Sequence, residues 1–355
     1  MRKLFLIAVI FFISINSFAC RFTIRDIGYT RLNIETYYVR FEVDTVKNQN
    51  LASYFRSQAN NYSSNANITY KILHTEDSKP LLSCINNKGK IIIQKSIVSK
   101  NDINTFFKYL FYSPIQKMMY NQIGDVFAFV IGFYDEDDKE INGIVDNAFE
   151  QFKRISPNLD KKVSEYIMKI VIPKDERKNE KVILNALGIN PDDNNPVVVV
   201  IYGRGRLADD PLVGNRITTH NILNQLVTLG TDCECGIDLS PLLKRAIPFN
   251  WNDRMSQIVA KMLDIDIENP MVLIEMSSIL SKEPLETGKS KFSAVPQTID
   301  LDKELNKREK QHDKVITDED NLVINITYIA LSSFVFVVLV ISIVLFRRKW
   351  NKDLS

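Results

Sequence analysis

A pattern of apolar segments that occurs twice in the same order constrains the fold of this chain more than any other feature. Each copy begins with a strand-like run, followed by a helical segment and a second strand, and a proline then directly precedes the next strand. A tight turn and a closing helix complete the copy. Because strands alternate with helices before the hairpin, the sequence predicts two α/β domains in tandem.

The first copy occupies residues 37–112. Pro80 directly precedes its third strand, and the run Asn-Asn-Lys-Gly-Lys at 86–90 is typical of a hairpin turn. The expected strands are 37–43, 68–73, 81–85 and 91–94, and the expected helices are 51–59 and 101–112.

The second copy occupies residues 126–229. Gly188 is expected to end a helix, Pro196 precedes a continuous apolar strand, and Thr218 or Thr219 is expected to cap the closing helix. The expected strands are 126–133, 166–172 and 197–202, and the expected helices are 141–155, 180–187 and 222–229.

This element order resembles the thioredoxin-like fold over residues 35–230, and two such domains in tandem look like part of a protein disulfide isomerase or a similar exported assembly. The residues that carry the resemblance are Pro80 with the hairpin after it, and Pro196 with the apolar strand and helix after it. In that family this proline is cis and faces the active site. The residues themselves also allow a trans proline that begins an edge strand.

The family's catalytic Cys-x-x-Cys pair lies after the first strand, where a helix N-terminus stabilises a thiolate. The corresponding segments, 44–55 and 134–145, contain no cysteine. Both domains therefore resemble the non-catalytic, binding type. The acidic run 135–138 is interpreted as a solvated helix cap rather than a cation site, because it lacks the ligand spacing of an EF-hand.

Four cysteines, Cys20, Cys84, Cys233 and Cys235, remain after the expected signal peptide and allow two disulfides. Cys84 alternates with an apolar residue in a strand and is predicted to be buried. The pair Cys233 and Cys235 could form a reducible disulfide, bind a soft metal together with His220 and Asp232, or bond to separate partners. We favour a structural disulfide with Cys20 as the outside partner, with no metal or other cofactor.

The run Gly203-Arg204-Gly205-Arg206 does not match a phosphate-binding loop. It is interpreted as a hairpin turn whose two arginines are exposed. Further along, the apolar run 271–276 is either part of an incomplete third repeat or an added strand.

Apolar segments near both ends predict export and anchoring in a membrane. Arg2, Lys3, an apolar run and the small residue Ala19 are typical of a cleaved signal peptide, although cleavage there would also leave Cys20 as a possible lipidation site. Residues 322–346 carry no charge and are long enough to cross a bilayer as one helix. The basic cluster at 347–349 then places the C-terminus in the cytoplasm.

The sequence is therefore divided into a signal peptide, two thioredoxin-like domains, a helical extension, a charged stalk, a transmembrane helix and a cytoplasmic tail. The respective segments are 1–19, 20–122, 123–236, 237–280, 281–321, 322–346 and 347–355.

The near balance of 45 Lys and Arg against 43 Asp and Glu gives no electrostatic reason to expect nucleic acid as a partner. No G-x-S-x-G or H-E-x-x-H motif indicates a hydrolase. We expect a single-pass, periplasmic or cell-surface binding or scaffold protein with a protein partner in the envelope. The alternatives are a thiol–disulfide oxidoreductase that uses Cys233 and Cys235, and an accessory subunit of a membrane transporter.

Overall fold

The computed structural model describes residues 22–76, 79–159, 166–231 and 240–281, all of which belong to one structural unit. The expected signal peptide, the membrane span and the stalk beyond Ser281 lie outside these ranges, as do Cys20, Cys233 and Cys235. Within the described ranges, no helix combines the length and hydrophobicity that crossing a bilayer requires.

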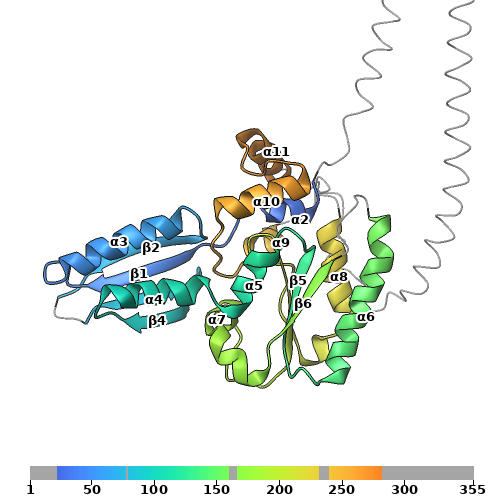
Figure 1. Cartoon of the computed structure of the whole chain (residues 1–355), viewed down its shortest axis with the longest axis horizontal. Coiled ribbons are helices and arrows are strands. Elements are labelled where there is room, and N and C mark those ends of the chain that lie inside the picture. The colour runs from blue at the N-terminus through green and yellow to red at the C-terminus, as the bar shows by residue number, and fades with distance from the viewer. Residues whose placement is uncertain (1–21, 77–78, 160–165, 232–239, 282–355) are drawn as a thin grey trace, which may run out of the picture. The chain divides into compact units, whose positions relative to one another are not determined.

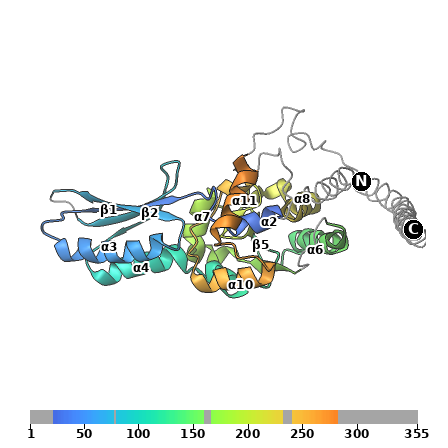
Figure 2. The ribbon, with the colours of Figure 1, turned by 90° about the horizontal axis from the view of Figure 1, so that it is seen from above.

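The first sheet has the strand order β2-β1-β3-β4, in which β1 and β2 are parallel and the other two pairs are antiparallel. Helix α3 connects β1 to β2, and α4 follows β4; both helices lie on the same face of the sheet (Figures 1 and 2). The elements are β1 (Tyr37–Val43), α3 (Gln49–Ser63), β2 (Ile68–His74), β3 (Leu81–Ile85), β4 (Ile91–Ser96) and α4 (Lys100–Phe111).

The second sheet has the order β6-β5-β7-β8, and β9 also pairs with β7. Strands β5 and β6 are parallel, whereas β7 runs antiparallel to β5. The strands are β5 (Ala128–Phe133), β6 (Ile167–Val171), β7 (Val197–Tyr202), β8 (Arg206–Leu207) and β9 (Leu212–Val213). The helices between and after them are α6 (Lys139–Ile155), η1 (Ser156–Asn158), η2 (Lys174–Glu180), α7 (Lys181–Leu187), η3 (Gly214–Arg216) and α8 (Thr219–Gly230).

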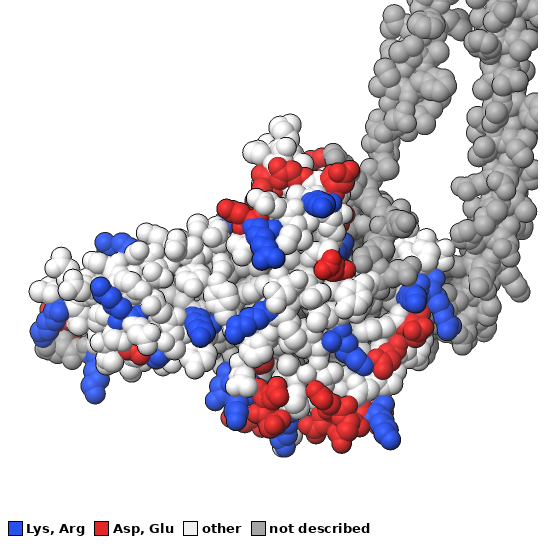
Figure 3. Space-filling view, viewed as in Figure 1, with Lys and Arg blue, Asp and Glu red and all other residues white. Residues whose placement is uncertain are grey.

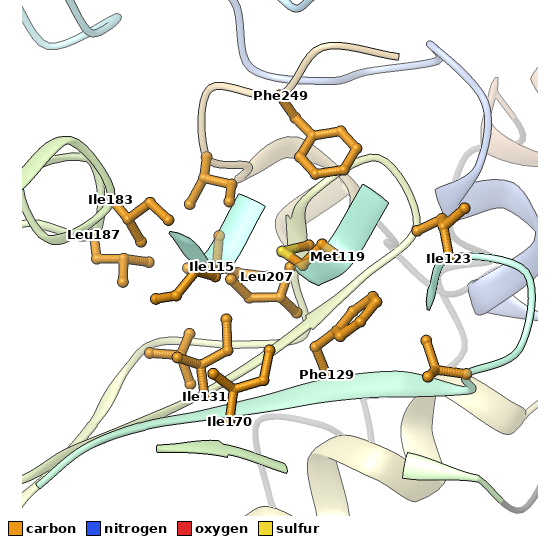
Figure 4. Close-up of a cluster of buried hydrophobic side chains, with 14 of the residues drawn as sticks. Ile115, Met119, Ile123, Phe129, Ile131, Ile170, Ile183, Leu187, Leu207 and Phe249 are labelled. Carbon is orange, nitrogen blue, oxygen red and sulfur yellow. The ribbon is translucent and has the colours of Figure 1, made fainter. Parts of the chain in front are cut away.

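The two sheets are covered differently. Every residue of β5 and β7 is buried, because apolar side chains fill both faces of the second sheet. On one of these faces, Met119 of α5 (Pro114–Gln122) and Ile183 of α7 pack against Phe129 and Ile131 (Figure 4). In β1, by contrast, buried and partly exposed residues alternate, as expected for a sheet with one solvated face.

The remaining helices are α2 (Ile24–Gly28), α9 (Ser240–Lys244), α10 (Asp253–Leu263) and α11 (Pro270–Ser281). Since the apolar run 271–276 lies within α11, it is not an added strand. Residues 22–34, here called the N-terminal strap, precede the first sheet in sequence. Their helix α2 contacts α8 of the second domain, although the sequence-based division assigned these residues to the first domain.

The structure confirms the predicted element order of both copies. Gly188 has a φ of 79° and ends α7, and the Thr218 side chain accepts a hydrogen bond from the Asn221 amide at the start of α8. The described residues contain no cis peptide bond, so Pro80 and Pro196 are trans, unlike the proline of the family. Both prolines directly precede a strand, as the sequence indicated.

Candidate functional site

In each domain a carboxylate lies between the first strand and the helix that follows it. Before α3, Asp44 Oδ1 accepts hydrogen bonds from the amides of Val46 at 3.1 Å and Lys47 at 3.0 Å. At the start of α6, Asp138 Oδ1 accepts one from the Ile141 amide at 3.0 Å, which confirms that this end of the acidic run caps the helix. Backbone amides therefore hold both carboxylates in place after the first strand of their domains.

Cys84 is the cysteine that the structure describes, and it is buried in β3. Burial raises the pKa of its thiol well above the ordinary value, since a thiolate would lose its hydration there. The predicted core role of Cys84 is confirmed. Among the described residues, no group of three or more His, Cys, Asp or Glu side chains could hold a metal ion.

The prediction that Arg204 and Arg206 are exposed was wrong. Their exposed fractions are 3% and 0%, because both side chains point into the N-terminal strap and donate hydrogen bonds to its carbonyl oxygens. Arg206 reaches Gly28 O at 2.9 Å through Nε and Thr30 O at 2.7 Å through Nη2. A buried guanidinium thus finds several acceptors at once, which offsets the cost of its desolvation.

The turn that carries these arginines lies directly against the strap. Gly203 has a φ of 53°, and a Cβ atom at this position would lie 2.3 Å from Gly28 O. Arg25 of the strap, in turn, donates to Val126 O at 2.9 Å and Phe127 O at 3.0 Å. The strap is therefore an integral part of the second domain.

Arg204 also organises the floor of a polar groove. Its guanidinium lies 4.5 Å from the centre of the Trp251 ring and pairs with the carboxylate of Glu268. Burial lowers the pKa of Arg204 to about 9, so the side chain is still charged at neutral pH. Trp251 Nε1 donates to Ser256 Oγ at 2.7 Å, and Ser256 Oγ donates to Glu268 Oε1 at 3.1 Å. These contacts hold the side chains at the floor of the groove in place without a ligand.

Two adjoining cavities, of about 270 and about 570 Å³, make up what we call the Trp251 groove. They share the lining residues Arg31, Asn65 and Trp251. The smaller cavity is otherwise lined by Asn33, Ile34, Thr36, Ala66, Asn67, Ile68, Thr69, Arg204 and Phe249. The larger one is otherwise lined by Asp253, Ser256, Gln257, Ala260, Asp266 and Glu268.

Asn67 connects the walls of the smaller cavity. Its side-chain nitrogen donates to Glu35 O and to Ile247 O, each at 3.0 Å, and its side-chain oxygen accepts from the Phe249 amide at 2.8 Å. Alongside, Ala66 forms an antiparallel bridge with Asn250. Segment 249–251 thereby lies against the outer edge of the residues just before β2 through an isolated bridge.

The structure does not bring the residues predicted as site residues together. Pro80 lies in the first domain and Pro196 in the second, each half-buried. His220 contacts the Asn224 side chain at 2.9 Å, and its proposed co-ligand Asp232 lies outside the described residues. Sequence reasoning missed the Trp251 groove, because segments as far apart as residues 31 and 268 form its walls.

Comparisons with known proteins find similarity to solved structures only. No family model and no curated protein matches the chain. The first two thioredoxin domains of Eps1p from Naumovozyma dairenensis are similar at 12% identity and a TM-score of 0.18, with 56% of this chain and 91% of that chain covered. For Eps1p from Saccharomyces cerevisiae the identity is 9% and the TM-score 0.19, with 54% and 90% covered. Human zinc-bound ERp44 is similar at 12% identity and a TM-score of 0.20, with 62% and 63% covered.

Because these TM-scores are low, the comparisons assign no function to any residue of this chain. The assignment of the fold rests instead on the strand order and the strand directions. Each sheet has two parallel strands joined through a helix, then an antiparallel pairing on the other side of the first strand, and a closing helix. Both domains of this chain therefore have the thioredoxin-like fold.

Proposed function

We propose that this chain is a membrane-anchored, extracytoplasmic binding protein whose thioredoxin-like domains are redox-inactive. The observation that carries the proposal is that both segments corresponding to the family's catalytic cysteines hold carboxylates bound by backbone amides, Asp44 after β1 and Asp138 at the start of α6. Cys84 supports it, because a fully buried thiol with a raised pKa is a poor nucleophile. The anchoring part of the proposal rests on the two apolar terminal segments.

Thiol–disulfide exchange by the full-length chain in lipid nanodiscs tests the redox part. The substrate is a fluorescent glutathione disulfide, and the control is the chain with both Cys233→Ser and Cys235→Ser. We expect the unaltered chain and the control to reduce the substrate equally slowly. Fast exchange that disappears in Cys233→Ser would overturn the proposal in favour of an oxidoreductase.

Protease treatment of sealed vesicles that contain the chain tests the topology. We expect a protease outside the vesicle to remove the exported region and to leave a short fragment that carries a C-terminal tag. Mass spectrometry of the mature N-terminus then shows whether the chain begins at Cys20 and whether that residue carries a lipid. A C-terminal tag that the outside protease removes would contradict the proposed orientation.

A further inference from the structure

We infer that the Trp251 groove, together with the outer edge of β2, binds an extended polypeptide segment that carries a basic side chain. This inference rests on the proposed binding function and names its site and the chemistry of its partner. Three features carry it: an unpaired strand edge, a cavity at the beginning of that edge, and the charge of the adjoining cavity.

The outer edge of β2 pairs with no other strand in the described part of the chain. Tyr37 N donates to Asn67 O at 2.9 Å and Thr75 N to Val43 O at 3.2 Å, so the odd-numbered residues of β2 direct their backbone groups toward β1. Because this direction alternates along a strand, the N–H and C=O groups of Tyr70 and Ile72 face outward. Such a row of backbone groups is a template for an added strand.

The chain itself already uses the beginning of this edge. Trp251 N donates to Asn65 O at 3.0 Å, and Asn67 N donates to Phe249 O at 3.4 Å, as in an antiparallel ladder. The pairing then stops, because the next residue in this alternation, Ile247, donates its N–H to Gly205 O at 2.9 Å instead. A partner strand along residues 69–74 would pair with the part of the edge that segment 249–251 leaves open.

The smaller cavity lies where the free edge begins. Five consecutive residues, 65–69, contribute to its lining, so a segment that leaves the edge of β2 enters this cavity directly. From there it reaches the larger cavity, since the two share Arg31, Asn65 and Trp251. A cavity of about 570 Å³ is large enough for an amino-acid side chain together with its hydration.

The charge of the larger cavity selects the partner. Its lining includes the carboxylates of Asp253, Asp266 and Glu268, and acidic side chains gather over α10 and α11 in the space-filling view (Figure 3). The buried Arg204 pairs with Glu268, whereas Asp253 and Asp266 form no ion pair within the described ranges. Arg31, the one cation of this lining, donates to the Ser64 carbonyl oxygen. The excess of carboxylates favours a lysine or arginine side chain and disfavours an anionic partner.

The test measures peptide binding by the full-length chain in nanodiscs. The probe is a nine-residue alternating Thr-Val peptide with a central lysine, and two comparison peptides carry a central glutamate or N-methyl groups at alternate positions. We expect the lysine peptide to bind best and the N-methylated one to lose binding. Replacing two exposed carboxylates, Asp253→Asn with Asp266→Asn, should weaken binding of the lysine peptide about tenfold.

Two variants complete the design. Ile72→Pro removes an outward N–H from an edge strand, where proline is tolerated, and should reduce binding of the lysine peptide at least tenfold. The matched charge control is Asp137→Asn with Glu140→Gln, two exposed acidic residues at α6 that lie outside the groove. This control should bind the peptide as the unaltered chain does.

Equal binding of the lysine and glutamate peptides would overturn the inference, as would an unchanged affinity in the Asp253 and Asp266 variant or no peptide binding at all. None of these results bears on the proposal that the domains are redox-inactive. The thiol-exchange assay tests that proposal separately. Conversely, exchange at Cys233 would overturn the proposed function whatever the peptide measurements show.

Discussion

Replacing Glu180 by glutamine should remove most of a pH dependence of stability that the structure builds into the second domain. Glu180 is fully buried where η2 meets α7, and its Oε1 accepts a hydrogen bond from the Ile115 amide at 2.9 Å. Its Oε2 has no partner among the described residues. Burial raises the pKa of this carboxyl from 4.5 to about 7, and the hydrogen bonds from Ser113 and Ile115 and the charge of Lys117 only partly oppose that shift.

The sign follows from linkage. The folded chain holds the proton more tightly than the unfolded chain, so the stabilisation is fully present below pH 4.5 and is lost as the pH rises through about 7. A shift of about 2.5 pKa units corresponds to about 3 kcal/mol of unfolding free energy, at 1.36 kcal/mol for each unit. Glutamine keeps the acceptor for Ile115 but cannot ionise. The variant should therefore lack this loss between pH 4.5 and 8.

Urea unfolding of the full-length chain, followed through Trp251 fluorescence in a Trp350→Phe background, measures the effect. Trp251 reports on the relevant region because it packs in the same apolar core as Ile115. Glu176→Gln, an exposed substitution four residues earlier on η2, is the matched control and should keep the pH dependence of the unaltered chain. If Glu180→Gln and Glu176→Gln lose equal stability between pH 4.5 and 8, the reasoning about the buried carboxyl is refuted.

Three other substitutions or reagents test the remaining contacts. Asn67→Ala removes three hydrogen bonds between separate segments and should lower the free energy of unfolding by about 3 kcal/mol, measured by urea denaturation. Arg206→Lys replaces a forked donor by a point charge and should expose the strap to limited proteolysis, whereas an unchanged digestion pattern would contradict the role of Arg206. Cys84 should react with an aromatic disulfide reagent only in denaturant, and prompt labelling in the native chain would show that the thiol is accessible.

The sequence predicts the elements of both domains well because each depends on local patterns. The alternating burial of β1 and the continuous burial of β7 follow the periodicity of their side chains, and Gly188 ends α7 in the left-handed conformation that favours glycine. Trans geometry at Pro80 and Pro196 was left open by the residues and departs from the family. Local patterns therefore fix the order of elements but not this detail.

The environment of Arg204 and Arg206 could not be read from the same patterns. A glycine–arginine run has the composition of an exposed turn, and the carbonyl groups that it contacts lie more than 170 residues earlier in the chain. Every residue type has a backbone carbonyl group, so the sequence does not show which carbonyl groups will accept a hydrogen bond from an arginine. The Trp251 groove was missed for the same reason, since Arg204 sets its floor and the strap forms one of its walls.

The two domains share a helix, so the core of each depends on the other domain. The first domain has only a short connection between β2 and β3, where the second domain has η2 and α7 between β6 and β7. Helix α7 also serves the first domain: Val182 packs in the core of the first sheet, and Asn185 Nδ2 donates to Ile92 O at 2.9 Å. One helix therefore completes two cores. Asn67, just before β2, also joins the first domain to segment 247–249 through hydrogen bonds. The two walls of the Trp251 groove are thus held by contacts that neither domain could provide alone.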